Sequence, residues 1–341
     1  MKIALDVMGG DFAPRNPMLG VQLALRELPQ IEKLFLVGQP EAIAREMKEL
    51  GIDPSDPRLE IVPASQVVDM ADSGLDAVRR KRDSSIARAV DLVKDGQAQA
   101  VVSAGHTGAA VTASLVKLRT LPLVERPAIA AVMPSATHSW VLIDAGANPD
   151  SQPEHLVHNA IMGSAYARGV LGRSKPRVGL MSNGTEEEKG NSLCKETGKL
   201  LRHTPGIEFI GNVEGHDLWE EPPDVVVCDG FTGNVILKTS EGLAKAMFGM
   251  IRSEVGKSLK TKLGALMAKP AFRRIHQRTS ADEAGGMPLL GLNGVTIISH
   301  GGASGLAMKN ALRQACMTIE QNLNPIISQA IERNLEHVPE V

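Results

Sequence analysis

Short, continuous apolar runs recur along this chain of 341 residues, and a polar turn or a helix-like segment follows most of them. Continuous rather than alternating runs are typical of strands buried on both faces, as in a parallel sheet. The runs cover residues 2–7, 33–37, 59–62, 100–103, 128–133, 140–143, 177–181, 207–210, 224–228 and 295–298. Helical periodicity lies between them, for example at residues 86–94 and 153–167. This alternation predicts a doubly wound α/β fold with a mostly parallel sheet and helices on both faces.

Both ends of the chain contribute strands to this pattern, so we expect one α/β domain over residues 1–341. Residues 242–278 depart from it, because they hold nine Lys and Arg residues against one acidic residue, Glu254. The rest of the chain has 28 basic and 38 acidic residues. The segment is therefore a basic excursion from an acidic body.

The apolar residues of this excursion recur at helical spacing of three and four. They include Leu243, Met247, Ile251, Val255, Leu259 and Leu263. The spacing predicts a projecting amphipathic helical hairpin, with Gly256 or Gly264 as the dividing point and Pro270 as its end. Two interpretations stay open and are compatible: the hairpin packs on the body or on a second subunit, or it lies on an anionic membrane surface.

Composition excludes several classes of protein. Aromatic residues make up only 3% of the chain and the net charge is −2, which argues against nucleic acid as a partner. The three cysteines have neither disulfide-like nor metal-like spacing, and the histidines form no metal-binding motif, so we expect no metal. No signal sequence and no apolar run of about 18 residues is present, which predicts a cytoplasmic protein.

Six glycine-rich turns follow the predicted strands. In an open parallel sheet, ligands bind outside the carboxyl ends of the strands, so we expect these turns to gather along one edge. Glycine lets the backbone approach an anion closely, and helix N-termini supply free N–H groups there. The turns therefore predict a phosphate or oxyanion cradle. Its candidate residues are Asp6, Gly9, Gly10, Asp11, Ser103, Gly105, His106, Thr107, Asp144, Asn148, Gly230, Thr232 and Gly233.

No nucleotide-binding motif and no nucleophile motif accompanies this cradle. The chain has no P-loop and no G-x-G-x-x-G after its first strand, and it has no G-x-S-x-G elbow. A reaction in which bound phosphate is itself the nucleophile needs none of these. Lys189 follows three acids, so it either pairs with them on a helix surface or points at an anion. Arg79 begins a basic stretch that is either a solvated loop or a binding site for phosphate or an acidic partner.

Taken together, several motifs resemble the PlsX family of acyl carrier protein:phosphate acyltransferases. In chain order they are residues 4–11 (ALDVMGGD), 79–85 (RRKRDSS), 102–105 (VSAG), 144–148 (DAGAN), 184–191 (GTEEEKGN), 227–235 (VCDGFTGNV), 288–291 (PLLG) and 299–301 (SHG). The resemblance implies transfer of a long-chain fatty acyl group from acyl carrier protein to inorganic phosphate. The acyl phosphate then serves the first acylation of glycerol 3-phosphate in phospholipid synthesis.

The resemblance also implies a homodimer with a fold like isocitrate and isopropylmalate dehydrogenases. It implies no metal or organic cofactor, and catalytic roles for Lys189 and Asn234. The hairpin matches the projecting hairpin that proteins of this family use for peripheral contact with the inner face of the cytoplasmic membrane. The resemblance also implies a downstream glycerol-phosphate acyltransferase as a further partner there. For the carrier, residues 79–82 and the hairpin are alternative docking surfaces.

On this basis phosphate is expected among the turns at residues 9–10, 103–108 and 233–234, with Lys189 orienting it and Asn234 donating to the oxyanion. The chain departs from the family pattern at three positions. His106 replaces the usual Asn, Ala284 a frequent Tyr, and Asn183 an aliphatic residue. If His106 touches phosphate, its protonation makes binding pH-dependent near neutrality; if it faces away, nothing follows.

Two alternative functions stay open. One is a phosphotransacetylase-like enzyme that uses coenzyme A, and the other is a catalytically silent scaffold that is recruited to the membrane.

Overall fold

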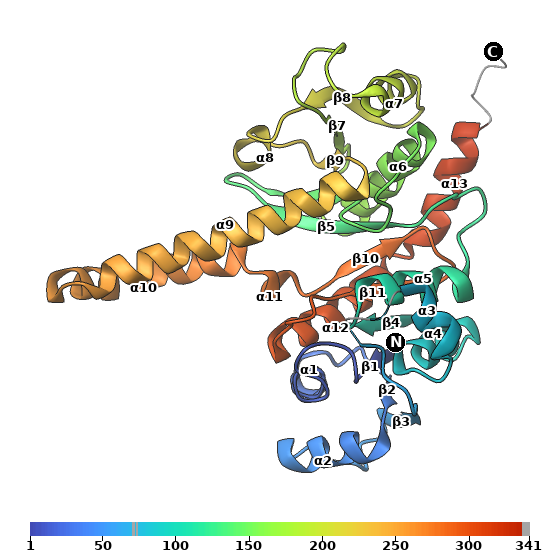
Figure 1. Ribbon diagram of the computed structural model, residues 1–341, viewed down its shortest axis with the longest axis vertical. Helices are drawn as coiled ribbons and strands as arrows, with labels where there is room; N and C mark the ends of the chain where they lie inside the picture. Colours follow the sequence, from blue (N-terminus) through green and yellow to red (C-terminus); the bar gives the residue numbers. More distant parts are fainter. Residues whose placement is uncertain (70–71, 73, 336–341) are drawn as a thin grey trace.

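A computed structural model describes residues 1–69, 72 and 74–335 (Figure 1). Its centre is one 11-stranded sheet of order β3-β2-β1-β4-β11-β10-β5-β6-β9-β7-β8. The strands are β1 (Lys2–Asp6), β2 (Lys33–Gly38), β3 (Leu59–Pro63), β4 (Ala100–Ser103), β5 (Ala128–Pro134), β6 (Ser139–Ile143), β7 (Arg177–Met181), β8 (Glu208–Val213), β9 (Val225–Val227), β10 (Met287–Leu290) and β11 (Val295–Ile298). Ten of them coincide with predicted strands. The exception is β10, which was not predicted.

The sheet consists of two parallel blocks that run in opposite directions. In the first block β3, β2, β1, β4 and β11 are parallel, and in the second β6, β9, β7 and β8 are parallel. Between the blocks β10 is antiparallel to both β11 and β5, and β5 is antiparallel to β6. Three reversals therefore separate the blocks, so their strands end at opposite edges of the sheet.

Helices cover both faces, as predicted. Successive residues of a strand point to opposite faces, so Ile3 and Leu5 of β1 pack with one set of helices while Ala4 packs with another. In the first block, α1 (Arg15–Glu27), α2 (Pro40–Leu50) and α12 (Gly305–Glu320) cover one face, and α4 (Ser85–Lys94) and α5 (Thr107–Leu118) the other. In the second, α6 (Pro153–Gly169), α7 (Ser192–Arg202) and α13 (Leu323–Leu335) pack on one face. The remaining short helices are α3 (Gly74–Arg80), α8 (Asp217–Glu220) and α11 (Ala281–Ala284).

The basic excursion is a helical hairpin that projects from the body (Figure 1). It consists of α9 (Gly230–Gly256) and α10 (Leu259–Thr279), divided at Gly256 and capped by Ser258. The prediction that Pro270 ends the hairpin was wrong, since α10 continues through it. No residue of α10 is buried among the described residues, so water can hydrogen-bond the carbonyl that Pro270 leaves without a donor.

Outside the body, this hairpin leaves a large apolar surface uncovered. Beyond the first two turns of α9, its exposed large apolar side chains are Leu243, Met247, Met250, Ile251, Leu259, Leu263, Leu266, Met267, Phe272 and Ile275. Within the described part of the chain, no helix is both long and apolar enough to cross a membrane.

Candidate active site

The predicted site residues lie in two groups, not one. We call the carboxyl ends of β1, β4 and β11 the first edge, and those of β6, β9 and β7 the second edge. Because the two blocks run in opposite directions, these edges lie at opposite ends of the strands. A strand of five residues alone spans about 16 Å. The prediction that all six turns gather at one edge was therefore wrong, and one phosphate ion cannot contact both groups within a chain.

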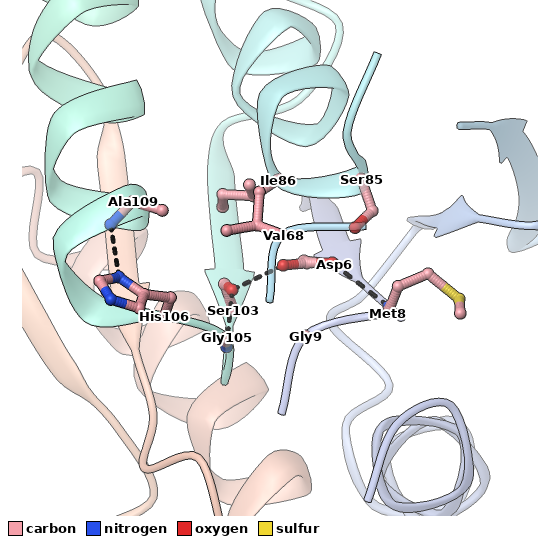
Figure 2. A pocket seen from close by; sticks show the side chains of 10 residues that line it. All are labelled: Asp6, Met8, Gly9, Val68, Ser85, Ile86, Ser103, Gly105, His106 and Ala109. Atoms are coloured by element: carbon pink, nitrogen blue, oxygen red, sulfur yellow. Dashed lines mark hydrogen bonds between the residues drawn. The ribbon is translucent and has the colours of Figure 1, made fainter. Parts of the chain in front are cut away.

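The first edge is organised around a buried carboxylate, Asp6 (Figure 2). Its Oδ2 accepts a hydrogen bond from Ser103 Oγ (2.7 Å), and its Oδ1 accepts one from the Met8 amide (3.2 Å). Ser103 Oγ in turn accepts from the Gly105 amide (3.1 Å). A Cβ at Gly9 would lie only 2.6 Å from Asp6 Oδ2, so the two turns can close on each other only because position 9 is glycine.

A cavity of about 10 Å³ lies beside Asp6, which is room for about one water molecule. Burial raises the pKa of Asp6, and hydrogen bonds from Ser85 and Ser103 partly offset this. His106 lines the same cavity, and its Nδ1 accepts from the Ala109 amide (3.1 Å), so the ring caps α5. The edge thus offers a satisfied carboxyl group and a small void, which suits a structural tie better than a phosphate cradle.

Other predicted residues of the first edge lie around this core. The Asp11 amide donates to the Gly301 carbonyl (2.8 Å), which joins the turns after β1 and β11. A Cβ at Gly10 would lie 3.0 Å from the same carbonyl oxygen. Thr107 is exposed at the start of α5. Arg79 is exposed on α3, which packs against the start of α5.

The second edge is organised around another buried carboxylate, Asp144. Its Oδ1 accepts from the amides of Gly146 (2.9 Å), Ala147 (2.8 Å) and Ile129 (3.1 Å). Its Oδ2 accepts from both the amide (2.8 Å) and the side-chain Nδ2 (2.9 Å) of Asn148. Burial raises the pKa of Asp144, and these amide hydrogen bonds partly offset the shift. The carboxyl group therefore holds the turn after β6 against the start of β5.

Helix α9 begins in close contact with this turn. Asp229 caps the helix by accepting from the Thr232 amide (2.9 Å) and from Thr232 Oγ1 (2.7 Å). A Cβ at Gly233 would overlap the carbonyl oxygen of Asp144, and one at Gly230 would lie 2.7 Å from the carbonyl oxygen of Asn148. Only glycine at both positions lets the N-terminus of α9 rest on the turn.

Asn234 and Lys189, the two predicted catalytic residues, both lie at the second edge. The Asn234 side chain lies against Gly146, since a Cβ added to Gly146 would lie 3.6 Å from Asn234 Oδ1. The side-chain amide of Asn234 is half-buried and makes no hydrogen bond to the described residues. Because β9 is flanked by β6 and β7, the turn that carries Lys189 lies beside the start of α9.

Lys189 does not pair with the three acids that precede it. The stem of the exposed Lys189 lies over Gly184, where a Cβ would be 2.6 Å from its Cγ. Glu187 pairs instead with Arg202 (2.7 Å), and the Lys189 ammonium has no ion pair or hydrogen bond within the described part of the chain. Of the two interpretations of Lys189, pairing with the preceding acids is not seen among the described residues. The other interpretation, an ammonium group that can bind an anion, remains.

Gly146 and Gly184 belong to two of the predicted glycine-rich turns, but they were not counted among the candidate site residues. The sequence signal for Gly146 was its place in a turn directly after a predicted strand, and the structure gives it a φ of 139°, which favours glycine. Across the residues that the structure describes, no three His, Cys, Asp or Glu side chains group as metal ligands would. The second edge therefore combines an unpaired ammonium, an unpaired amide and a helix N-terminus, which together suit an anion and a developing oxyanion.

Comparisons with known proteins give relatives over the whole chain. The family model described as "Fatty acid synthesis protein" matches residues 1–325. The chain is 49% identical to a phosphate acyltransferase of Akkermansia muciniphila, covering 100% of this chain and 98% of that protein. It is 47% identical to a phosphate acyltransferase of Desulfitobacterium hafniense, covering 98% of each.

Solved structures with a similar fold are more distant in sequence. A phosphotransacetylase from Streptococcus pyogenes is 19% identical with a TM-score of 0.62, covering 97% of this chain and 94% of that one. A 4-hydroxythreonine-4-phosphate dehydrogenase from Klebsiella pneumoniae is 15% identical with a TM-score of 0.50, covering 94% and 98%. At this identity the likeness shows the fold alone, and it confirms the predicted dehydrogenase-like α/β architecture.

The contact between α9 and Asp144 can be tested by adding one carbon. We expect Gly233→Ala to lower the free energy of unfolding by about 3 kcal/mol or more, because its Cβ would overlap the Asp144 carbonyl. Gly242→Ala, in open space on the same helix, should raise it by about 0.5–1 kcal/mol. Denaturant unfolding of both variants measures the difference, and equal effects would contradict the close packing.

The raised pKa of Asp6 predicts a pH-dependent contribution to stability. A carboxyl group whose pKa is raised on folding contributes stability below its unfolded pKa and loses it as pH rises through the folded value. The stability of the wild type relative to Asp6→Asn should therefore fall as pH rises above about 4, the ordinary pKa of an aspartate.

Asp53→Asn is the control with the opposite sign. Hydrogen bonds from Ser55 lower the pKa of Asp53, so its contribution is lost as pH falls. Denaturant unfolding at pH values from below 4 up to neutrality checks both variants, because the contribution of Asp53 is lost below the ordinary pKa of an aspartate and that of Asp6 above it. A wild type that gains stability over Asp6→Asn as pH rises would show that Asp6 is not shifted upwards.

Proposed function

Since this chain belongs to the fatty acid synthesis protein family and is an acyltransferase, we propose that it transfers a long-chain fatty acyl group from acyl carrier protein to inorganic phosphate. The observation that carries the proposal is the unpaired Lys189 ammonium at the same sheet edge as the unpaired Asn234 amide. The resemblance to PlsX proteins, first seen in the motifs, is confirmed by the family match.

In the proposed reaction a phosphate oxygen attacks the thioester carbon. Lys189 offsets part of the phosphate charge and orients the attacking oxygen. The new O–C bond forms as the carbonyl π electrons move to the carbonyl oxygen, and the side-chain amide of Asn234 donates to that oxyanion. The tetrahedral intermediate then expels the thiolate of the carrier arm, which takes the proton that phosphate brought. The products are acyl phosphate and the free thiol, and no protein nucleophile is needed.

Positioning supplies the rest of the acceleration. The Asp144 carboxyl group fixes the turn after β6 and Asp229 caps α9, so the hydrogen bonds that both accept from neighbouring donors partly offset their negative charge. The start of α9 then presents backbone amides and a positive dipole end to the anion. Fixed donors of this kind do not have to reorganise as charge develops.

We place the reaction at the membrane surface, before the first acylation of glycerol 3-phosphate. The basic, exposed and apolar hairpin supports contact with an anionic membrane, and it supports a homodimer equally. A phosphotransacetylase-like enzyme that uses coenzyme A remains the alternative, favoured by the structural likeness to the Streptococcus pyogenes enzyme. Such an enzyme has no evident need of this hairpin.

The donor is identified by comparing two thioesters. Purified protein should release thiol from palmitoyl-acyl carrier protein only when inorganic phosphate is present, and hydroxylamine should trap the acyl phosphate. Faster phosphate-dependent release from palmitoyl-coenzyme A would favour the alternative donor. If neither thioester releases thiol, acyl transfer to phosphate is contradicted altogether.

Removing the ammonium group of Lys189 should slow turnover without unfolding the protein. We expect Lys189→Ala to lower kcat on the order of 100-fold, as for loss of one transition-state contact. Lys199→Ala, an exposed lysine on α7, is the matched control and should leave kcat unchanged. Thiol release at saturating substrates measures both, and a Lys189→Ala enzyme with normal kcat would remove Lys189 from the mechanism.

Contact of the hairpin with a membrane can be tested with vesicles. We expect Leu259→Asp combined with Leu263→Asp to abolish sedimentation with anionic phosphatidylglycerol vesicles, because both side chains are exposed near the hairpin tip. Leu200→Asp places the same charge on α7 and should bind vesicles like the wild type. Undiminished binding of the double variant would contradict hairpin docking.

A further inference from the structure

An arginine without a polar contact lies where the chain returns from α5 to the start of β5. Arg126 is exposed, and within the described residues it makes no hydrogen bond or ion pair. Sequence reasoning gave it no role, because the segment 119–127 holds charged residues of both signs and no recognisable motif. Its position follows from the reversal of strand direction, which brings the amino end of β5 to the second edge.

The backbone on both sides of Arg126 is held in place. Before it, Glu125 Oε2 lies 2.9 Å from His155 Nε2, and Val124 is buried. After it, the Pro127 carbonyl accepts from Asn148 Nδ2 (2.7 Å), and the Ile129 amide donates to Asp144 Oδ1 (3.1 Å). Arg126 is thus anchored to the same turn that α9 rests on.

We propose that Arg126 binds a phosphate group at the second edge, opposite Lys189. The strand order β5-β6-β9-β7 places these two cations on either side of the turn after β6 and the start of α9. This inference rests on the proposed function of that edge. A planar guanidinium can bind two phosphate oxygens at once, whereas an ammonium acts as a point charge. The two cations together match the double negative charge of inorganic phosphate, whereas a phosphodiester carries a single negative charge that the guanidinium alone can offset.

No carboxylate of the edge takes up this guanidinium. Asp144 accepts hydrogen bonds through both oxygens, Asp229 is engaged by Thr232, and Glu125 is engaged by His155. An exposed arginine commonly remains solvated and does nothing. Arg45 of α2 is such a residue: it too is exposed and without a polar contact among the described residues, but it lies at the far end of the sheet.

Two sources of the phosphate group fit this chemistry. One is the inorganic phosphate that attacks the thioester, and the other is the phosphodiester of the carrier's pantetheine arm. Steady-state kinetics distinguish them, because each substrate has its own KM. We expect Arg126→Ala to raise one KM about 10- to 100-fold, as for a lost charge-assisted hydrogen bond, with a smaller effect for Arg126→Lys. A raised KM for phosphate identifies the free ion, and a raised KM for the acyl carrier identifies the arm.

Arg45→Ala is the matched control and should leave both KM values unchanged. If Arg126→Ala keeps both KM values within twofold of Arg45→Ala while its melting temperature equals that of the wild type, the proposal is overturned. A merely structural arginine would lower the melting temperature and the amount of active enzyme without raising one KM selectively.

Binding without turnover keeps this test independent of the proposed reaction. Phosphate should raise the melting temperature of the wild type and of Arg45→Ala more than chloride does at equal ionic strength. If Arg126 binds the free ion, that gain should be lost in Arg126→Ala. If it binds the arm, acyl carrier protein that bears the pantetheine arm should stabilise the wild type more than carrier without the arm, and that difference should be lost in the variant. Failure of the proposed function, seen as absent thiol release by the wild type, leaves this measurement valid.

Discussion

The rest of the second edge depends on the contact between the N-terminus of α9 and the turn after β6. Asp144 accepts hydrogen bonds from three backbone amides of that turn and from one of β5, and the missing side chain at Gly233 lets the helix rest on the carbonyl oxygen of Asp144. This contact fixes where α9 starts, and therefore where Asn234 points and in which direction the long hairpin leaves the body. The same residue pair thus links the proposed chemistry at one end of the helix with the exposed apolar surface at the other.

Opposed strand directions decide which residues can act together. Because β10 and β5 reverse the chain between the two blocks, Asp6, Ser103 and His106 occupy the first edge, whereas Lys189 and Asn234 occupy the second. The polar groups of the first edge mainly satisfy one another around a cavity for one water. At the second edge an ammonium, an amide and a guanidinium have no partner in the described chain. Unpaired groups of this kind are the ones available to a substrate.

Local sequence predicted the elements well and their directions badly. The apolar runs gave ten strands, since a strand buried on both faces needs a continuous run. Strand β10 was missed because it contains Pro288, and a proline within a short apolar run argues against a strand. Strand direction depends on pairing between distant segments, so the sequence could not show that the six turns divide between two edges. Lys189 and Asn234 were identified by motif resemblance, whereas Arg126 becomes notable only when the fold sets Pro127 against Asn148. At Pro270 a local signal was misleading: proline usually ends a helix, but the exposed helix α10 continues through this residue.

The most direct test of the central claim is to locate bound phosphate by crystallography of the protein soaked in phosphate. The account predicts an anion at the second edge, at the start of α9, within contact distance of Lys189 and Asn234. An anion seated instead at the first edge, beside Ser103 and His106, with the second edge occupied only by water, would contradict it.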